Sequence, residues 1–234
     1  SVFNYSNEQF GKINLLDATA HSVNTVFVPL GMKAGLNNVV DVARRAGIPD
    51  SVQMWATPSV SLGVASPHVI DVASAYATFA SGGVYAKPFM VKEVLGANQG
   101  VLYESRIQAQ QVFSSEVMSD LTYALQGVVK YGTGTAAAVG LNRPIAGKTG
   151  TTDSSAAVWF VGYTPDLAAA VWVGDPRGGQ SYPMKNLTIN GRFYAQVFGS
   201  LMPGPVWREA MKGALADTPP TKFTLKTLNG LNTG

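Results

Sequence analysis

The sequence has 234 residues, of which 46% are hydrophobic and 13% charged, with a formal net charge of +3 and no cysteine. This composition predicts a folded core and excludes an intrinsically disordered chain. The small net charge and the scattered Lys and Arg residues argue against a nucleic-acid partner. The absence of Cys excludes thiol catalysis, zinc-thiolate sites and disulfides, and no segment reaches the ~18 uninterrupted apolar residues of a membrane span.

The two ends of the sequence differ from the rest of the chain. The first residues, SVFNYSNEQFG, have neither the basic nor the apolar region of a signal peptide, and they resemble the middle of a domain. Residues 219–234 are rich in Thr, Pro and Gly, which is typical of a tail. We therefore expect a domain portion over residues 1–218, followed by a tail, within a longer polypeptide.

Helical patterns dominate the first half of the sequence. Apolar residues at helical spacing, serine or proline starts and glycine stops predict a helix that breaks near 21–24, followed by helices over 36–47, 66–83 and 114–132. β-type residues on both sides of an Ala-Asn-Gln-Gly turn predict a hairpin over 84–105.

Strand patterns follow after residue 144. Runs of β-branched and aromatic residues predict strands over 145–152, 156–163 and 167–175, and the Thr-Pro-Asp turn joins the last two as a hairpin. Residues 192–215 are predicted to be helical in two parts, broken at Pro-Gly-Pro. A helical block, an antiparallel sheet and a final helix together indicate an α+β fold.

The segment Ala-Gly-Lys-Thr-Gly-Thr-Thr at 146–152 raises the question of a phosphate loop. Such a loop needs a glycine five residues before the Gly-Lys pair, where this sequence has Asn142, and a helix directly after the lysine. The residues after Lys148 are strand-like instead. The pattern therefore argues against phosphate binding.

The same segment has the chemistry of a catalytic edge strand. Lys148 supplies a positive charge, and Thr149 and Thr151 place two hydroxyls on one face because strand side chains alternate. Gly150 between them leaves room for a ligand beside the backbone. Such a row suits a carboxylate and an acyl carbonyl, whereas a solvated Lys on a Thr-rich strand is the alternative for this motif taken alone.

A second motif lies far upstream. Ser22-Val23-Asn24 places a hydroxyl and an amide on one turn at the predicted helix break, where Ser can relay a proton and Asn can hold a substrate amide. Taken alone, the motif is typical of a helix cap. In this order with Lys-Thr-Gly, it matches two of the three motifs of the serine penicillin-recognising enzymes, S-x-x-K, S-x-N and K-T-G.

Other polar residues are better explained by structure. His21 adjoins Ser22 but no carboxylate completes a triad, and His68 follows a Ser-Pro helix start. No His, Asp and Glu set has metal-ligand spacing, so neither a metal nor a cofactor is implied.

Longer stretches extend the similarity over residues 15–211. They are PSVSLGVASPHVIDVASAYATFASGGVYAKP, YGTGTAA, AGKTGTT, WFVGYTPDLAAAVWVGDP and VWREAM. Together they resemble the transpeptidase domain of class A, bifunctional penicillin-binding proteins. The resemblance implies an antiparallel sheet flanked by helices with a mostly helical lobe. It also implies an extracytoplasmic, membrane-anchored bacterial enzyme that cross-links peptidoglycan stem peptides and is acylated by β-lactams.

The resemblance also assigns roles to the motif residues. Lys148 would stabilise the ligand carboxylate and keep Ser22 poised to relay a proton to the leaving amine, and Asn24 would orient the acyl side. Thr149 and Thr151 would bind the terminal carboxylate beside Gly150, and the Thr151 N–H would form half of the oxyanion hole.

One family motif is missing, because no serine in the sequence has a lysine three positions later. We therefore expect the nucleophile to lie on an upstream segment of the same domain, and this chain alone to be inactive. Two alternatives stay open. One is a serine β-lactamase, which needs a glutamate-bearing loop between the two motifs, and the other is a non-catalytic sensor or scaffold domain.

Overall fold

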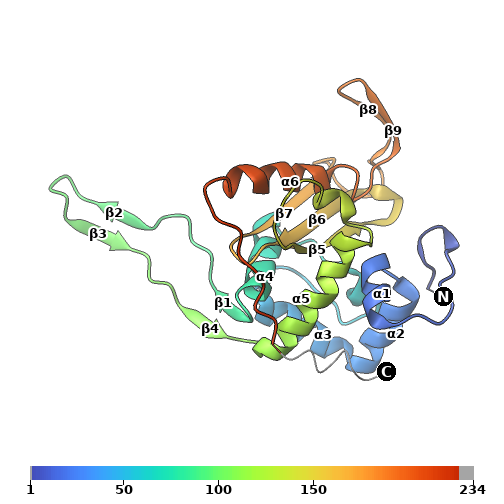
Figure 1. Ribbon diagram of the computed structural model, residues 1–234, viewed down its shortest axis with the longest axis horizontal. Coiled ribbons are helices and arrows are strands. Elements are labelled where there is room, and N and C mark those ends of the chain that lie inside the picture. The colour runs from blue at the N-terminus through green and yellow to red at the C-terminus, as the bar shows by residue number, and fades with distance from the viewer. Residues whose placement is uncertain (1, 227–234) are drawn as a thin grey trace.

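The computed structural model describes residues 2–226, and its fold is α+β, which confirms the predicted fold class (Figure 1). Helices come first, an antiparallel sheet follows, and a last helix packs back on the sheet. The α-helices of the described chain are α1 (Leu15–His21), α2 (Asn24–Ala34), α3 (Leu36–Ala46), α4 (Val69–Ala80), α5 (Ser115–Lys130) and α6 (Pro203–Ala214).

The central sheet has three antiparallel strands in the order β5-β6-β7. The strands are β5 (Ala146–Thr151), β6 (Ala157–Tyr163) and β7 (Ala168–Gly174). Lys148 pairs with Val161, and Thr151 pairs with Val158. The Lys-Thr-Gly strand therefore lies at an edge of this sheet, as the sequence predicts.

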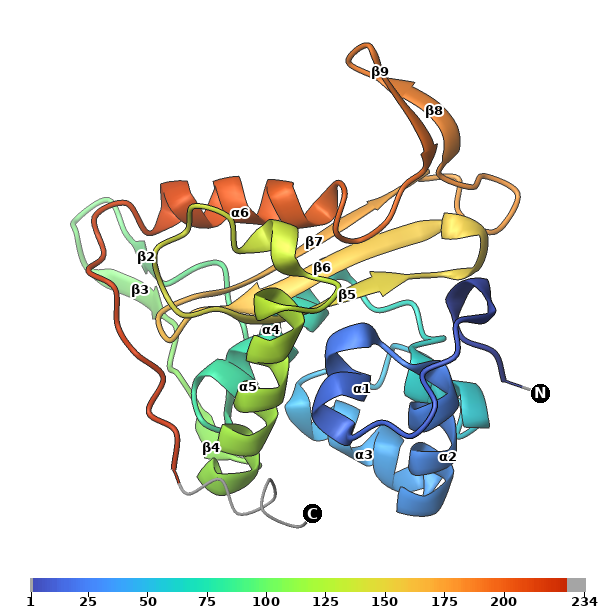
Figure 2. The same cartoon turned by 45° about the vertical axis from the view of Figure 1, so that its right-hand side comes forward.

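Helices cover both faces of the sheet (Figure 2). On one face the buried Phe160 ring meets the Trp207 ring of α6 edge to face, with centroids 5.1 Å apart. On the other face Tyr163 packs on Tyr76 of α4 and shares a 2.8 Å hydrogen bond with Thr122 of α5. This is the period-two alternation of a strand buried on both sides. Strand β5 packs against α5 on this second face.

The three helices predicted over 36–47, 66–83 and 114–132 are confirmed as α3, α4 and α5. The predicted break near residue 22 is also confirmed, since α1 ends at His21 and α2 begins at Asn24. Strong apolar periodicity and clear end signals explain why these helices are visible in the sequence.

The prediction of two helices over 192–215 is wrong in its first part. Residues Arg192–Gln196 form strand β9, which pairs with β8 (Lys185–Ile189). Asn190 and Gly191, both with positive φ, form the connecting turn, an Asn-Gly hairpin signal that outweighs the local helical pattern. Pro203 does not break a helix either: it begins α6, where its missing N–H costs nothing.

The predicted hairpin over 84–105 is confirmed in its outer part. It is formed by β2 (Glu93–Leu95) and β3 (Val101–Glu104), which project from the body as an arm (Figure 1). The base of the arm is a pairing that the sequence did not indicate, between β1 (Val84–Ala86) and β4 (Ala109–Gln111).

The described part of the predicted tail lies against the domain. The Phe223 ring packs on Tyr163 at 5.6 Å, and Thr221 Oγ1 donates to Asp166. Residues 227–234 of the tail lie outside the described residues, and the division at residue 218 stays a prediction. Among residues 2–226, no helix has both the length and the apolar character required to cross a bilayer.

Candidate active site

Ser22 occupies the corner between α1 and α2. Its backbone is left-handed, with φ 58° and ψ 51°, a conformation that glycine usually supplies at a helix end. The Val23 N–H donates to Ala18 O at 3.0 Å and closes the end of α1. A serine in this conformation carries strain of order 1–2 kcal/mol. Such strain is often found where a side chain must be presented for function.

Lys148 reaches this corner from the middle of β5. Its Nζ donates to Ser22 Oγ at 2.8 Å and to Thr149 O at 3.1 Å. Burial lowers the pKa of Lys148 from its usual 10.5 to about 8. Within residues 2–226 no carboxylate lies within ion-pair distance of Lys148. The ammonium is thus a half-buried cation suited to an anionic ligand.

Thr149 and Thr151 share one face of β5, and both lie against Gly199. The Gly199 N–H donates to Thr151 Oγ1 at 3.4 Å, and Thr149 Cβ is 3.1 Å from the position that a Cβ on Gly199 would take. Gly150 between them carries no side chain, and a Cβ there would meet Trp159 Cβ at 3.2 Å. The two hydroxyls have different partners, since Thr149 Oγ1 lies 2.6 Å from Thr133 Oγ1 and Thr151 Oγ1 accepts from Gly199.

Asn24 begins α2, two residues after Ser22. Its Nδ2 donates to Phe3 O at 3.0 Å. The structure thus brings Ser22 and Lys148 into direct contact across 126 residues, whereas Asn24 is bound to the N-terminal segment.

Sequence reasoning missed Gly132 and Thr133, which join the two motifs. The Thr133 N–H donates to Ala20 O at 3.0 Å, and Thr133 Oγ1 lies 2.6 Å from Thr149 Oγ1. A Cβ on Gly132 would lie 2.2 Å from Ala20 O, so only glycine fits. The sequence predicts Gly132 only as the stop of the helix over 114–132, and the similarity of YGTGTAA to the family was the available signal.

The two histidines have structural contacts. The His21 ring stacks on Phe10 at 5.9 Å, and His68 Nδ1 lies 3.1 Å from Asp71 Oδ2 in a capping box at the start of α4. In the part of the chain that the structure describes, no group of three His, Asp or Glu side chains is placed to hold a metal ion.

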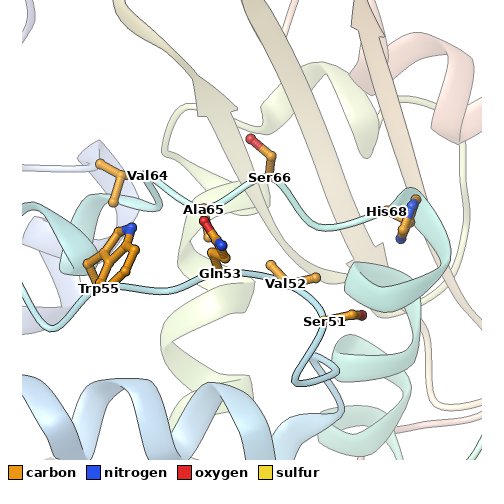
Figure 3. A pocket seen from close by; sticks show the side chains of 8 residues that line it. All are labelled: Ser51, Val52, Gln53, Trp55, Val64, Ala65, Ser66 and His68. Carbon is orange, nitrogen blue, oxygen red and sulfur yellow. The ribbon is translucent and has the colours of Figure 1, made fainter.

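A separate pocket of about 360 Å³ lies between the loops 51–55 and 64–68 (Figure 3). Trp55, which is 67% exposed, forms one wall of it with Val64. None of the predicted site residues lines this pocket, and its lining carries no charged pair. The contact between Ser22 and Lys148 therefore lies outside this pocket.

Comparisons with known proteins identify the family of the chain. The family model for the penicillin binding protein transpeptidase domain matches residues 2–186. The chain is 34% identical over 248 residues to penicillin-binding protein 1A of Mycobacterium tuberculosis, covering 97% of this chain and 29% of that protein. The corresponding protein of Aquifex aeolicus is 32% identical over 226 residues, with 97% and 29% covered.

Solved structures give the same result. The structure of the PonA1 protein from Mycobacterium tuberculosis in complex with penicillin V superposes with a TM-score of 0.82 at 32% identity, covering 96% of this chain and 62% of that one. The chain spans about 29% of the length of the first two curated relatives. It belongs to the penicillin-binding protein transpeptidase domain family, among its class A members.

Proposed function

We propose that this chain is the C-terminal part of a peptidoglycan D,D-transpeptidase domain, which cross-links stem peptides through a serine acyl-enzyme and is acylated by β-lactams. The 2.8 Å hydrogen bond from Lys148 Nζ to Ser22 Oγ carries this proposal, because it brings two motifs 126 residues apart into direct contact. The penicillin V complex of the PonA1 protein supports the β-lactam part.

The nucleophile is a serine of an S-x-x-K motif on an upstream segment outside these 234 residues, in which no serine has that spacing. Its oxygen attacks the carbonyl of the penultimate D-Ala and forms the ester bond. The C–N bond then breaks, and Ser22 passes a proton to the departing D-Ala amine. An amine of a second stem peptide takes the acyl group and releases the serine.

Lys148, Thr149 and Thr151 bind the charged end of the donor. The half-buried ammonium and the two hydroxyls attract the terminal carboxylate, and this interaction is strengthened by partial exclusion of water. The backbone N–H of Thr151 stabilises the oxyanion, and Gly150 lets the ligand lie close to the strand. Asn24 orients the acyl side.

The proposal includes a cellular location for the protein. The relatives named penicillin-binding protein 1A suggest the extracytoplasmic face of a bacterial membrane, with the anchor on a segment outside this sequence. In this proposal the 234 residues are inactive by themselves.

The test is covalent labelling of the full-length protein with a fluorescent penicillin, followed by peptide mapping. We expect one adduct, on the serine of an S-x-x-K segment outside residues 1–234, that persists for hours. Absence of any adduct would support a non-catalytic domain. An adduct that turns over within milliseconds would indicate a β-lactamase instead.

A further inference from the structure

The N-terminal residues Phe3, Asn4 and Tyr5 lie beside the site. They contact one motif directly, at Asn24, and are linked to the strand of the other motif only through Phe198 and Gly199. Phe3 and Asn4 bind the start of α2, whereas Tyr5 contacts the segment beside Thr151. No role for these residues follows from the motifs themselves.

Asn4 caps a helix that has no cap of its own. The residue at the N-cap of α2 is Val23, whose side chain offers no acceptor. Asn4 Oδ1 accepts instead from Thr25 N at 3.1 Å and from Thr25 Oγ1 at 3.2 Å. Its Nδ2 donates to Glu8 O at 2.9 Å and fixes its own turn. An N-cap supplied from 21 residues away stabilises the first turn, in which Asn24 stands.

Phe3 fixes the side chain of Asn24. Its carbonyl accepts one of the two Nδ2 protons of Asn24 at 3.0 Å. A planar amide with one proton bound can no longer rotate freely, so its second N–H and its Oδ1 have defined directions. Those two groups are the donor and acceptor that a ligand amide requires.

Tyr5 contacts the other wall of the site. Its ring meets the Phe198 ring edge to face at 5.4 Å. The next residue, Gly199, donates its N–H to Thr151 Oγ1. Tyr5 therefore packs on the segment that donates a hydrogen bond to the Thr151 hydroxyl.

We propose that Asn4 and Tyr5 are positioning residues of the acylation site, with separable effects. Asn4 aligns Asn24 for the amide of the acyl donor, and Tyr5 aligns Thr151 for its carboxylate. The inference rests on the proposed function and identifies which part of the ligand each residue serves.

The experiment uses two β-lactams on the full-length protein. Benzylpenicillin carries an acylamido group and a carboxylate, whereas 6-aminopenicillanic acid has the carboxylate and a free amine in place of the amide. Asn4→Ala should lower the second-order acylation rate for benzylpenicillin about fivefold, the equivalent of one lost N-cap, and leave that for 6-aminopenicillanic acid nearly unchanged. Tyr5→Ala should lower both rates about threefold, through the lost aromatic pair.

Matched variants separate positioning from folding. Asn4→Asp keeps the acceptor for Thr25 and should be acylated by benzylpenicillin at close to the wild-type rate. Tyr5→Phe keeps the ring and should be acylated by both ligands at close to the wild-type rates. Glu8→Ala in the same turn, whose side chain makes no hydrogen bond in the described residues, should resemble wild type.

The possible outcomes are distinct. The inference about Asn4 is overturned if Asn4→Ala lowers the acylation rate equally for both ligands. It is also overturned if the wild type is acylated and Asn4→Ala is acylated at the same rate. Unchanged rates in Tyr5→Ala overturn the inference about Tyr5. If the wild type itself is acylated by neither ligand, the proposed function fails. This outcome is distinct from a failure of the inference, because it is seen without any substitution.

Discussion

At the scale of single residues, Lys148 has the most informative environment. Its ammonium is held by one hydroxyl and one carbonyl, without a carboxylate partner in residues 2–226, and burial brings its pKa down to about 8. The pKa falls because burial disfavours the charged form. Lys148 is therefore mostly protonated below pH 8 and mostly neutral above it.

This pKa predicts an alkaline limb in the rate profile. The second-order acylation rate of the full-length protein reports the free enzyme, so it should fall as pH rises through about 8, since neutral Lys148 no longer attracts the ligand carboxylate. The measurement is the rate with a fluorescent penicillin from pH 6 to 10. Lys148→Ala should be slower throughout and lack this limb. If the acylation rate of the Ala variant fell equally above pH 8, the fall would be caused by a titratable group other than Lys148.

Removal of Lys148 also has a predicted magnitude. Lys148→Ala loses a charge-assisted contact of ~1.5–3 kcal/mol, which corresponds to about one to two decades in acylation rate. The rate of fluorescent penicillin labelling in the full-length protein measures this. Lys212→Ala, at a half-exposed position on α6, is the control. Labelling at the wild-type rate without Lys148 would remove it from the mechanism.

Thr151 tests whether the backbone or the hydroxyl matters. Thr151→Ser keeps the acceptor for the Gly199 N–H and should change acylation only mildly. Thr151→Pro removes the N–H assigned to the oxyanion hole and should lower the rate by about two decades or more. A thermal melt of each variant checks that the fold is intact. Normal acylation by a folded Pro variant would contradict the oxyanion assignment.

At the scale of elements, the site depends on the junction between α1 and α5. The Thr133 N–H satisfies the carbonyl of Ala20 at the end of α1, while the Thr133 hydroxyl meets Thr149 on β5. Three elements distant in sequence are thereby fixed relative to one another, and Ser22 and Lys148 are fixed with them.

Gly132 is the residue that permits this junction, and its substitution should be costly. In Gly132→Ala the new Cβ would lie 2.2 Å from Ala20 O, against backbone that cannot give way easily. We expect a loss of about 1–3 kcal/mol in the free energy of unfolding, measured by denaturant titration, together with slower acylation. Gly213→Ala in α6 meets nothing within 4 Å and should be neutral or stabilising. Equal stability of the two variants would contradict the junction.

The sequence predicted the elements with regular periodicity, and its two kinds of miss have different causes. Helices such as α5 carry an apolar stripe and a capping serine, so local pattern suffices. Strand β9 was mistaken for helix because its local helical pattern was given more weight than the Asn-Gly turn that pairs it with β8. Thr133 was missed because its partners, Ala20 and Thr149, are distant in the sequence.

At the scale of the whole molecule, the site combines groups from three regions of the chain. The N-terminal segment, the turn at Ser22 and the strand at Lys148 meet at one place. In the proposed function they supply proton relay, ligand orientation and charge, but no serine in the sequence has the S-x-x-K spacing. The chain also spans about 29% of the curated relatives it resembles.

The 234-residue chain alone should therefore form no covalent adduct with penicillin. Acylation requires a serine hydroxyl whose proton a nearby base removes. Ser22 Oγ accepts from the Lys148 ammonium, and its proposed role is relay. Supplying a polypeptide with the S-x-x-K segment of the same protein should restore labelling, and the label should map to that added segment. Intact-mass analysis after penicillin treatment is the measurement. An adduct on Ser22, or on any other residue of this chain, would refute the division of the site and make these 234 residues catalytic by themselves.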